Sequence, residues 1–338
     1  MMGRSLSTLP SDDDTWAFTL ITPDGVLSGA IDVASDLLQS AGFTIASAQL
    51  MPIDLKRMYQ VYENSDYMPD ERAKHPRNPQ MSLRMFDDLY SLAPACLLML
   101  RRPNGSACKT LAACKGNTRP EYADPSSVRA QGENVILNYM HSPDDPASAV
   151  RELACIVGTA ESNRLMEMTR RGPGVAEAIM GMDALRASMP ATAGWSALSF
   201  PWIANRIRQR IVQRLGALAA SDEEVVTVLT QVSEELAAQR RSLESASGTR
   251  QRMLTAQQSN NRIHTILSYA TAHEKYQPMA KGLDMLSELH CLQGRRDLSA
   301  VRSLIDQGIY LSPLEKVAVE AHSYAFVPGE QLNGMYPA

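Results

Sequence analysis

Strand-forming sequence is confined to the first part of this chain, and that limit constrains its fold more than any other feature. Four β-prone runs alternate there with helical patterns: Trp16–Thr22, Phe43–Met51, Ala95–Arg101 and Asn134–Met140. Strands mixed with helices at this spacing predict a sandwich in which helices pack on one sheet. The strand signal ends at Gly158, so the remainder of the chain is expected to be helical.

The C-terminal part has the pattern of packed helices. From Pro201, isoleucines and leucines recur at helical spacing, and Ser221 to Glu224 has the form of a capping box. The segments show no clean repeat period, so a helical bundle is predicted rather than a named solenoid. The chain is accordingly divided into a flexible tail, a mixed domain, a linker with short helices and a helical bundle or interaction domain, over residues 1–14, 15–158, 159–200 and 201–338.

Composition and charge argue against several classes of protein. The net charge is −4, no apolar run approaches the length of a membrane span, and the first residues lack the apolar region of a signal peptide. The five cysteines include no CxxC pair and indicate reduced thiols rather than a metal site. These features predict a cytoplasmic protein without a membrane segment. Nucleic acid is not the favoured partner, because the arginines from Arg206 to Arg214 precede acidic residues and are expected to pair internally.

One histidine stands in a pattern that suggests chemistry. His141 belongs to the segment Asn138-Tyr-Met-His141-Ser-Pro-Asp144, and Glu152 lies eleven residues further on. A lone histidine is more often a structural hydrogen-bonding group, so the argument rests on the residues upstream. In chain order these are Thr22-Pro-Asp-Gly25, Tyr59, Gly116-Asn-Thr118-Arg-Pro120 and Ser127-Val-Arg129.

This ordered series resembles the nucleoside diphosphate kinase family, from Thr15 to Gly158. In that family a strand ends in Lys-Pro-Asp-Gly, a loop carries Gly-x-Thr-x-Pro, an arginine follows, and Asn-x-x-His-x-Ser-Asp closes the site. The resemblance implies an α+β ferredoxin-like sandwich, βαββαβ with an antiparallel sheet, followed here by an all-α helical domain. It also implies a homo-oligomer.

The reaction that the resemblance implies is a ping-pong phosphotransfer. A nucleoside triphosphate would phosphorylate His141, which would pass the phosphate to a nucleoside diphosphate, and Glu152 would orient the imidazole. The chemistry suits these residue types, because a neutral imidazole is a competent nucleophile near pH 7 and phosphoryl transfer needs mainly positioning and charge neutralisation. Mg²⁺ would be the cofactor, held by the nucleotide phosphates rather than by a protein metal site.

The resemblance also assigns nucleotide-binding roles. Arg129 and Thr118 would hold phosphate oxygens, Asn138 the ribose hydroxyl, and Tyr59 would pack beneath the histidine. Taken singly, each of these residues has an ordinary structural explanation. Their shared order is what favours the functional one.

Several positions depart from the family pattern. The lysine that ends the first strand is replaced by Thr22, and a second phosphate-binding arginine by Ala112. The family's serine after the histidine is replaced by Pro143, and the family's arginine before the asparagine is replaced by Leu137. Two cationic contacts to phosphate are therefore missing, and each can contribute several kcal/mol to the transition state.

Other basic residues are candidates to replace the lost charge. They are Lys74 and Arg77 in the long loop Asn64–Gln80, and Lys115 beside the lost arginine. Three hypotheses stay open, and an active phosphotransferase is favoured among them. The alternatives are a nucleotide-binding pseudoenzyme or scaffold, and a protein that acts through its helical half, which would then bind a protein partner.

Overall fold

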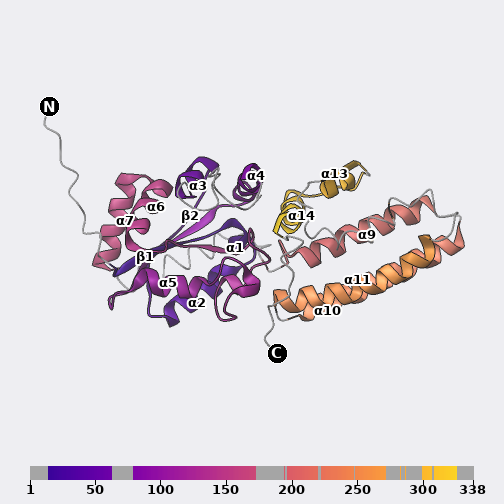
Figure 1. Cartoon of the computed structure of the whole chain (residues 1–338), viewed down its shortest axis with the longest axis horizontal. Helices are drawn as coiled ribbons and strands as arrows, with labels where there is room; N and C mark the ends of the chain where they lie inside the picture. The colour runs from indigo at the N-terminus through magenta and orange to yellow at the C-terminus, as the bar shows by residue number, and fades with distance from the viewer. Residues whose placement is uncertain are drawn as a thin grey trace. The chain divides into compact units, whose positions relative to one another are not determined.

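The computed structural model describes residues 14–62, 79–172, 194, 196–219, 222–246, 248–271, 282, 286, 299–306 and 308–325. The chain forms two compact units (Figure 1). The first contains Met1–Gly132 and Asn138–Trp195, and the second contains Glu133–Leu137 and Ser196–Ala338. Five residues in the middle of the first half therefore fold with the second.

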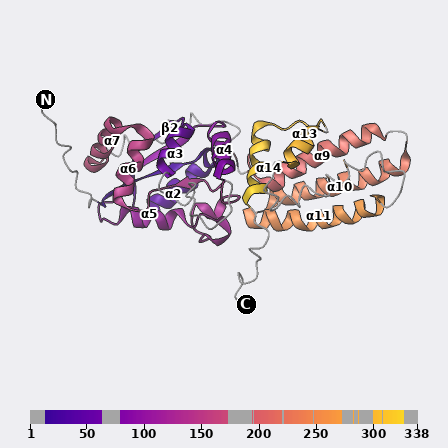
Figure 2. The same ribbon diagram turned by 45° about the horizontal axis from the view of Figure 1, so that its top comes forward.

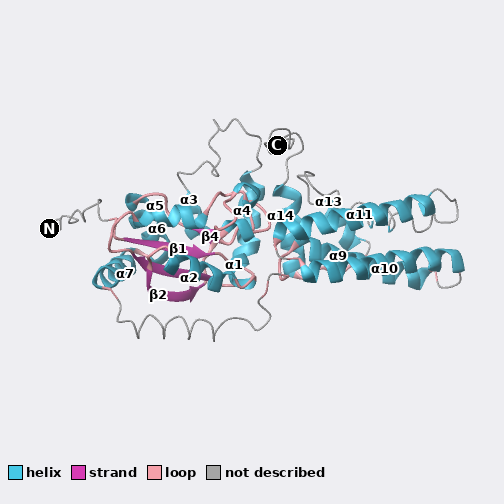
Figure 3. Cartoon of the chain, turned by 90° about the horizontal axis from the view of Figure 1, so that it is seen from below, coloured by secondary structure: helices cyan, strands magenta, loops and turns pink. Residues whose placement is uncertain are grey.

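The first unit is built on a four-stranded antiparallel sheet. Its strands lie in the order β2-β3-β1-β4 and span Thr44–Met51, Ala95–Arg101, Trp16–Ile21 and Met140–His141. Figure 3 shows the strands of this sheet in magenta. Every neighbouring pair is antiparallel, and Leu20 of β1 lies opposite His141 of β4. This order confirms the antiparallel ferredoxin-like sheet expected from the sequence. The two central strands, β1 and β3, are buried along nearly their whole length, which explains their almost unbroken apolar sequences.

Helices cover both faces of this sheet. In chain order they are α1 (Pro23–Leu27), α2 (Ala30–Ser40), α3 (Leu55–Tyr62), α4 (Pro79–Tyr90), α5 (Ala107–Lys115), α6 (Pro146–Val157) and α7 (Thr159–Arg171). Two short 3-10 turns, η1 (Pro120–Tyr122) and η2 (Arg129–Gln131), lie between α5 and β4. Helices α2 and α5 contact each other on one side of the sheet, and α6 and α7 contact each other on the other side (Figures 1 and 2).

Two segments differ from their sequence-based descriptions. The strand expected over Asn134–Met140 is wrong, since only Met140 and His141 pair with β1. The Asn134 side chain accepts hydrogen bonds from the backbone N of Ile136 and Leu137, which removes those amides from strand pairing. Residues 159–171, at the start of the expected linker, form the single helix α7, whose Leu165 and Met166 belong to the core of the first unit.

The second unit is helical, as its sequence indicated. It contains α9 (Phe200–Leu218), α10 (Glu223–Ser245), α11 (Thr249–Thr271), α13 (Ser299–Asp306) and α14 (Pro313–Ala325). Helices α9, α10 and α11 lie side by side (Figure 2). Asp222 is the N-cap of α10 and accepts hydrogen bonds from the backbone N of Glu224 and Val225.

The arginine-rich stretch of α9 does have an acidic partner within the chain. Arg206 and Arg210 both form ion pairs with the buried carboxylate of Glu315 on α14, rather than with the acidic residues that follow α9 in sequence. In the parts of the chain that are described, no helix has the length and apolar character needed to cross a bilayer.

Candidate active site

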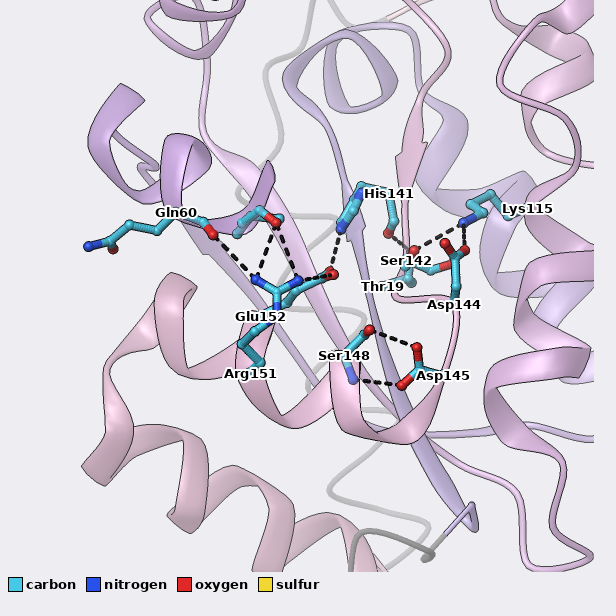
Figure 4. A network of polar contacts seen from close by, with 11 residues as sticks. Thr19, Gln60, Lys115, His141, Ser142, Asp144, Asp145, Ser148, Arg151 and Glu152 are labelled. Atoms are coloured by element: carbon cyan, nitrogen blue, oxygen red, sulfur yellow. Dashed lines mark hydrogen bonds and ion pairs between the residues drawn. The ribbon is translucent and has the colours of Figure 1, made fainter. Parts of the chain in front are cut away.

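His141 is held by a carboxylate from the helix that follows it. Helix α6 begins just after the histidine, because the Asp145 side chain caps it by accepting a hydrogen bond from the backbone N of Ser148. The second turn of α6 then presents Glu152, whose Oε2 lies 2.8 Å from Nε2 of His141 (Figure 4). Arg151 donates to the other carboxylate oxygen at 3.0 Å. Glu152 therefore fixes the orientation of the imidazole ring.

Burial favours the neutral form of this ring. His141 is only 9% exposed, and burial lowers the pKa of its imidazole, although the Glu152 carboxylate acts in the opposite direction. Since a carboxylate only accepts hydrogen bonds, a neutral ring in this position carries its proton on Nε2. The lone pair is then on Nδ1, so Nδ1 is the ring nitrogen that can act as a nucleophile.

Three residues expected to bind phosphate and ribose lie together. Arg129, at the start of η2, donates from Nε to the carbonyl of Met140 at 2.9 Å and from Nη1 to Oγ1 of Thr118 at 3.1 Å. The amide of Asn138 donates from Nδ2 to the carbonyl of Thr118 at 3.1 Å. A guanidinium, a hydroxyl and an amide are thus fixed beside the backbone that leads to His141.

Lys115, the last residue of α5, is a buried cation close to this group. Its Nζ donates to the carbonyl of Ser142 at 3.0 Å and lies 3.2 Å from Oδ1 of Asp144 (Figure 4). Burial lowers the pKa of Lys115, and the positive charge of Arg129 lowers it further. The charges of Lys115 and Arg129 also lower the pKa of His141, so both cations act electrostatically on the ring.

Asp24 is a site residue that the sequence interpretation treated only as part of a turn. Pro23–Leu27 is the short helix α1, and the buried Asp24 carboxylate accepts a hydrogen bond from the backbone N of Tyr139 at 2.9 Å. Tyr139 has a φ of 71°, a left-handed conformation that costs energy for a residue with a bulky side chain. Asp24 therefore holds a strained residue between Asn138 and His141.

Glycine is required beside this contact. A Cβ on Gly25 would lie 2.6 Å from the carbonyl O of Tyr139 and 2.7 Å from Cγ2 of Ile21. Both distances are too short for a carbon contact, so no larger side chain fits without a shift of the backbone. The Pro-Asp-Gly sequence could have indicated this close approach, but it does not identify Tyr139 as the partner.

Tyr59, Lys74 and Arg77 are not among the residues that make these hydrogen bonds in the described parts of the chain. Tyr59 is on α3 and 41% exposed. The contact from α3 toward the site runs instead through the backbone carbonyls of Gln60 and Val61, which accept hydrogen bonds from Arg151 (Figure 4). Lys74 and Arg77 lie outside the described residues. Within the described parts of the chain, no three histidines, cysteines or carboxylates gather in a way that could hold a metal ion.

Comparison with known proteins identifies the first unit. Residues 16–162 match the family model of nucleoside diphosphate kinase. Residues 16–162 are a domain of the nucleoside diphosphate kinase family. Family membership supports a nucleotide-binding transferase, and the match ends before the helical half begins.

Curated relatives are similar over the same stretch. The nucleoside diphosphate kinase of Bdellovibrio bacteriovorus is 29% identical over 140 residues, which are 40% of this chain and 88% of that protein. The enzyme of Halalkalibacterium halodurans is 26% identical over 155 residues, which are 46% of this chain and 96% of that protein. The solved nucleoside diphosphate kinase of Encephalitozoon cuniculi is 18% identical, with a TM-score of 0.36, and the match covers 43% of this chain and 89% of that one.

Two basic positions of the kinase family are apolar or neutral in this domain. Thr22 is buried at the end of β1, where its backbone N donates to the carbonyl of Tyr139. Ala112 is half-buried on α5. Lys115, one turn further along α5, is the cation that the structure brings to the histidine loop instead.

Proposed function

We propose that this protein is a nucleoside diphosphate kinase-type phosphotransferase that carries the phosphate on Nδ1 of His141. The observation that supports this most directly is the 2.8 Å contact between Nε2 of His141 and Glu152 in a buried setting. That contact leaves the lone pair of the neutral ring on Nδ1, as nucleophilic catalysis requires.

The reaction has two matched halves. In the first, the Nδ1 lone pair attacks the terminal phosphorus of a nucleoside triphosphate, the bond to the bridging oxygen breaks, and the nucleoside diphosphate leaves with the electron pair. In the second, a terminal phosphate oxygen of another nucleoside diphosphate attacks phosphorus and the P–N bond breaks. Glu152 keeps the proton on Nε2 and stabilises the positive charge that the ring gains.

Binding is assigned to the residues around the ring. Arg129, Lys115 and Thr118 would hold phosphate oxygens, and Asn138 the ribose hydroxyl. Mg²⁺ would arrive with the nucleotide and neutralise part of the phosphate charge. Tyr59, and Lys74 or Arg77 from the loop after it, complete the proposed binding set. A homo-oligomer, a cytoplasmic location and a protein partner for the helical half stay predictions.

One observation favours a second candidate function. Thr22 and Ala112 occupy positions that are basic in the family, so the domain could bind nucleotides without useful turnover. It would then serve as a sensor or scaffold, with assembly left to the helical half. The two proposals differ in one measurable property, which is whether His141 acquires phosphate.

The test is phosphorylation by ATP that carries a label on its γ-phosphate, with Mg²⁺ present. The active proposal expects an acid-labile, base-stable label that His141→Ala abolishes and a nucleoside diphosphate removes. His264→Ala is the matched control, since His264 is exposed on α11 and should not affect labelling. Nucleotide binding by calorimetry without any label would support the scaffold. Undiminished label in His141→Ala would refute the assignment of the nucleophile.

A further inference from the structure

The loop directly before the proposed active site belongs to the helical unit. Residues Glu133–Leu137 lie inside the stretch that matches the kinase family, yet they fold with Ser196–Ala338. The chain leaves the kinase domain after Gly132 and returns at Asn138, which is three residues before His141. Leu137 and Asn138 share a peptide bond, so a displacement of Leu137 acts first on Asn138.

This loop is compact and closed by its own hydrogen bonds. The backbone N of Glu133 donates to the carbonyl of Leu137 at 2.8 Å, and the Asn134 side chain accepts from Ile136 and Leu137. The side chains of Ile136 and Leu137 are buried, at 5% and 0% exposed. Because the loop is closed by hydrogen bonds and its apolar end is buried, we expect the loop to move as one piece with the helical unit.

Glu133 joins the loop to helices of the second unit. Its Oε2 accepts a hydrogen bond from the backbone N of Phe200, in the first turn of α9, at 3.3 Å. A carboxylate is favourable there, because the first amides of a helix have no partner within the helix and carry partial positive charge. The Phe200 ring in turn stacks on His322 of α14, with centroids 3.5 Å apart.

Arg252 of α11 provides the compensating charge. Its Nη2 lies 3.6 Å from Oε1 of Glu133, and the two side chains are 7% and 2% exposed. Burial raises the pKa of Glu133 to about 7, and the charge of Arg252 opposes that rise. Removal of one member of a buried ion pair leaves the other charge without compensation, so this contact is sensitive to substitution.

We propose that the helical unit positions the nucleotide-binding residue Asn138 through this loop, with Glu133 and Arg252 as positioning residues. The inference rests on the proposed function for its kinetic consequence. The polypeptide beyond the loop is already fixed, since Asp24 binds Tyr139 and β1 pairs with Met140. Asn138 lies between the loop and these fixed residues, so a movement of the loop acts first on Asn138 and on its hydrogen bond to the Thr118 carbonyl.

The expected consequence is weaker nucleotide binding with little change in chemistry. In the full chain, Glu133→Gln and Arg252→Met should each raise the KM for the nucleoside triphosphate roughly fivefold or more. The rate of His141 phosphorylation at saturating nucleotide should change much less. The double variant Glu133→Gln/Arg252→Met removes both charges and should recover most of the loss, because no buried charge is left alone.

The control and a second readout keep the result interpretable. Arg262 lies on α11, as Arg252 does, and pairs with Glu235 of α10; the variant Arg262→Met breaks this pair and should leave KM unchanged. Hydrogen exchange followed by mass spectrometry needs no activity: residues 138–141 should exchange faster in both single variants, but not in Arg262→Met. The milder Arg252→Lys provides a folded substitute if Arg252→Met does not fold.

The outcomes separate the two proposals. Absence of histidine phosphorylation in the wild type would overturn the proposed function, while exchange at residues 138–141 would still decide this inference. Unchanged exchange in folded Glu133→Gln and Arg252 variants would overturn the coupling, whatever the activity of the wild type.

Discussion

At the scale of single residues, the proposed phosphotransfer depends most on Lys115. This lysine brings a buried positive charge to the loop that follows His141. Members of the family have two further basic residues in this domain, at the positions that are Thr22 and Ala112 here. The present partners of Lys115, the Ser142 carbonyl and Asp144, are groups that a phosphate could replace. A preorganised cation of this kind stabilises the charge that develops on a transferring phosphoryl group.

We therefore expect Lys115→Met to slow His141 phosphorylation roughly a hundredfold. Lys115→Arg should retain more of the rate, since it keeps the charge. Single-turnover labelling with γ-labelled ATP measures both. Lys109→Met, which removes an exposed lysine from the same helix, is the control. A rate for Lys115→Met equal to that of Lys109→Met would show that the buried lysine is structural.

At the scale of elements, the short helix α1 is coupled to β4 through one buried carboxyl. Burial raises the pKa of Asp24 from 3.8 to about 6, in spite of the hydrogen bond that its carboxylate accepts from the backbone N of Tyr139. Between these two pH values the folded state binds more protons than the unfolded state. The contribution of Asp24 to stability is therefore greatest below about pH 4 and is lost as the pH rises through 6.

Asp24→Asn should remove this dependence, because an amide oxygen still accepts from the backbone N of Tyr139 but does not ionise. Relative to the variant, the wild type should lose on the order of 3 kcal/mol of unfolding free energy between pH 4 and 7. Urea unfolding at a series of pH values gives the difference. Asp36→Asn, an exposed carboxyl on α2, is the control. Parallel curves for wild type and Asp24→Asn would contradict the expectation.

Some of these elements could be predicted from the sequence, and others could not. Local patterns sufficed where one segment determines its own structure: β3 has the predicted bounds, Ala95–Arg101. They failed at Asn134–Met140, where the buried residues Ile136 and Leu137 suit a strand but belong to the other unit. The partners of Asp24 and Glu133 could not be predicted from the neighbouring sequence either. Each partner lies more than one hundred residues away along the chain or is a backbone group.

At the scale of the whole molecule, the shared loop predicts that the two units unfold together. Unfolding of the helical unit would expose Ile136 and Leu137 and leave Glu133 without Arg252. Leu236→Ala removes a completely buried side chain of α10, at a cost of about 2–5 kcal/mol. For a single transition of the whole chain, this cost should lower the melting temperature by roughly 3–7 °C.

Differential scanning calorimetry of the full chain measures this shift. Leu218→Ala is the control, because Leu218 at the end of α9 is 71% exposed and its truncation should leave the transition in place. Two resolved transitions, of which Leu236→Ala moves only one, would show that the units unfold independently.

The division of the helical unit into two stretches of chain has a consequence for protein synthesis. A ribosome completes Glu133–Leu137 before it makes any of the helices that bury this loop. Arg252 is added 115 residues after Leu137, a delay on the order of ten seconds at usual rates of elongation. During that time the strands of the sheet and His141 have been made, but the loop Glu133–Leu137 lacks the helices that bury it. The first half of this protein can reach its final structure only after the second half has been translated.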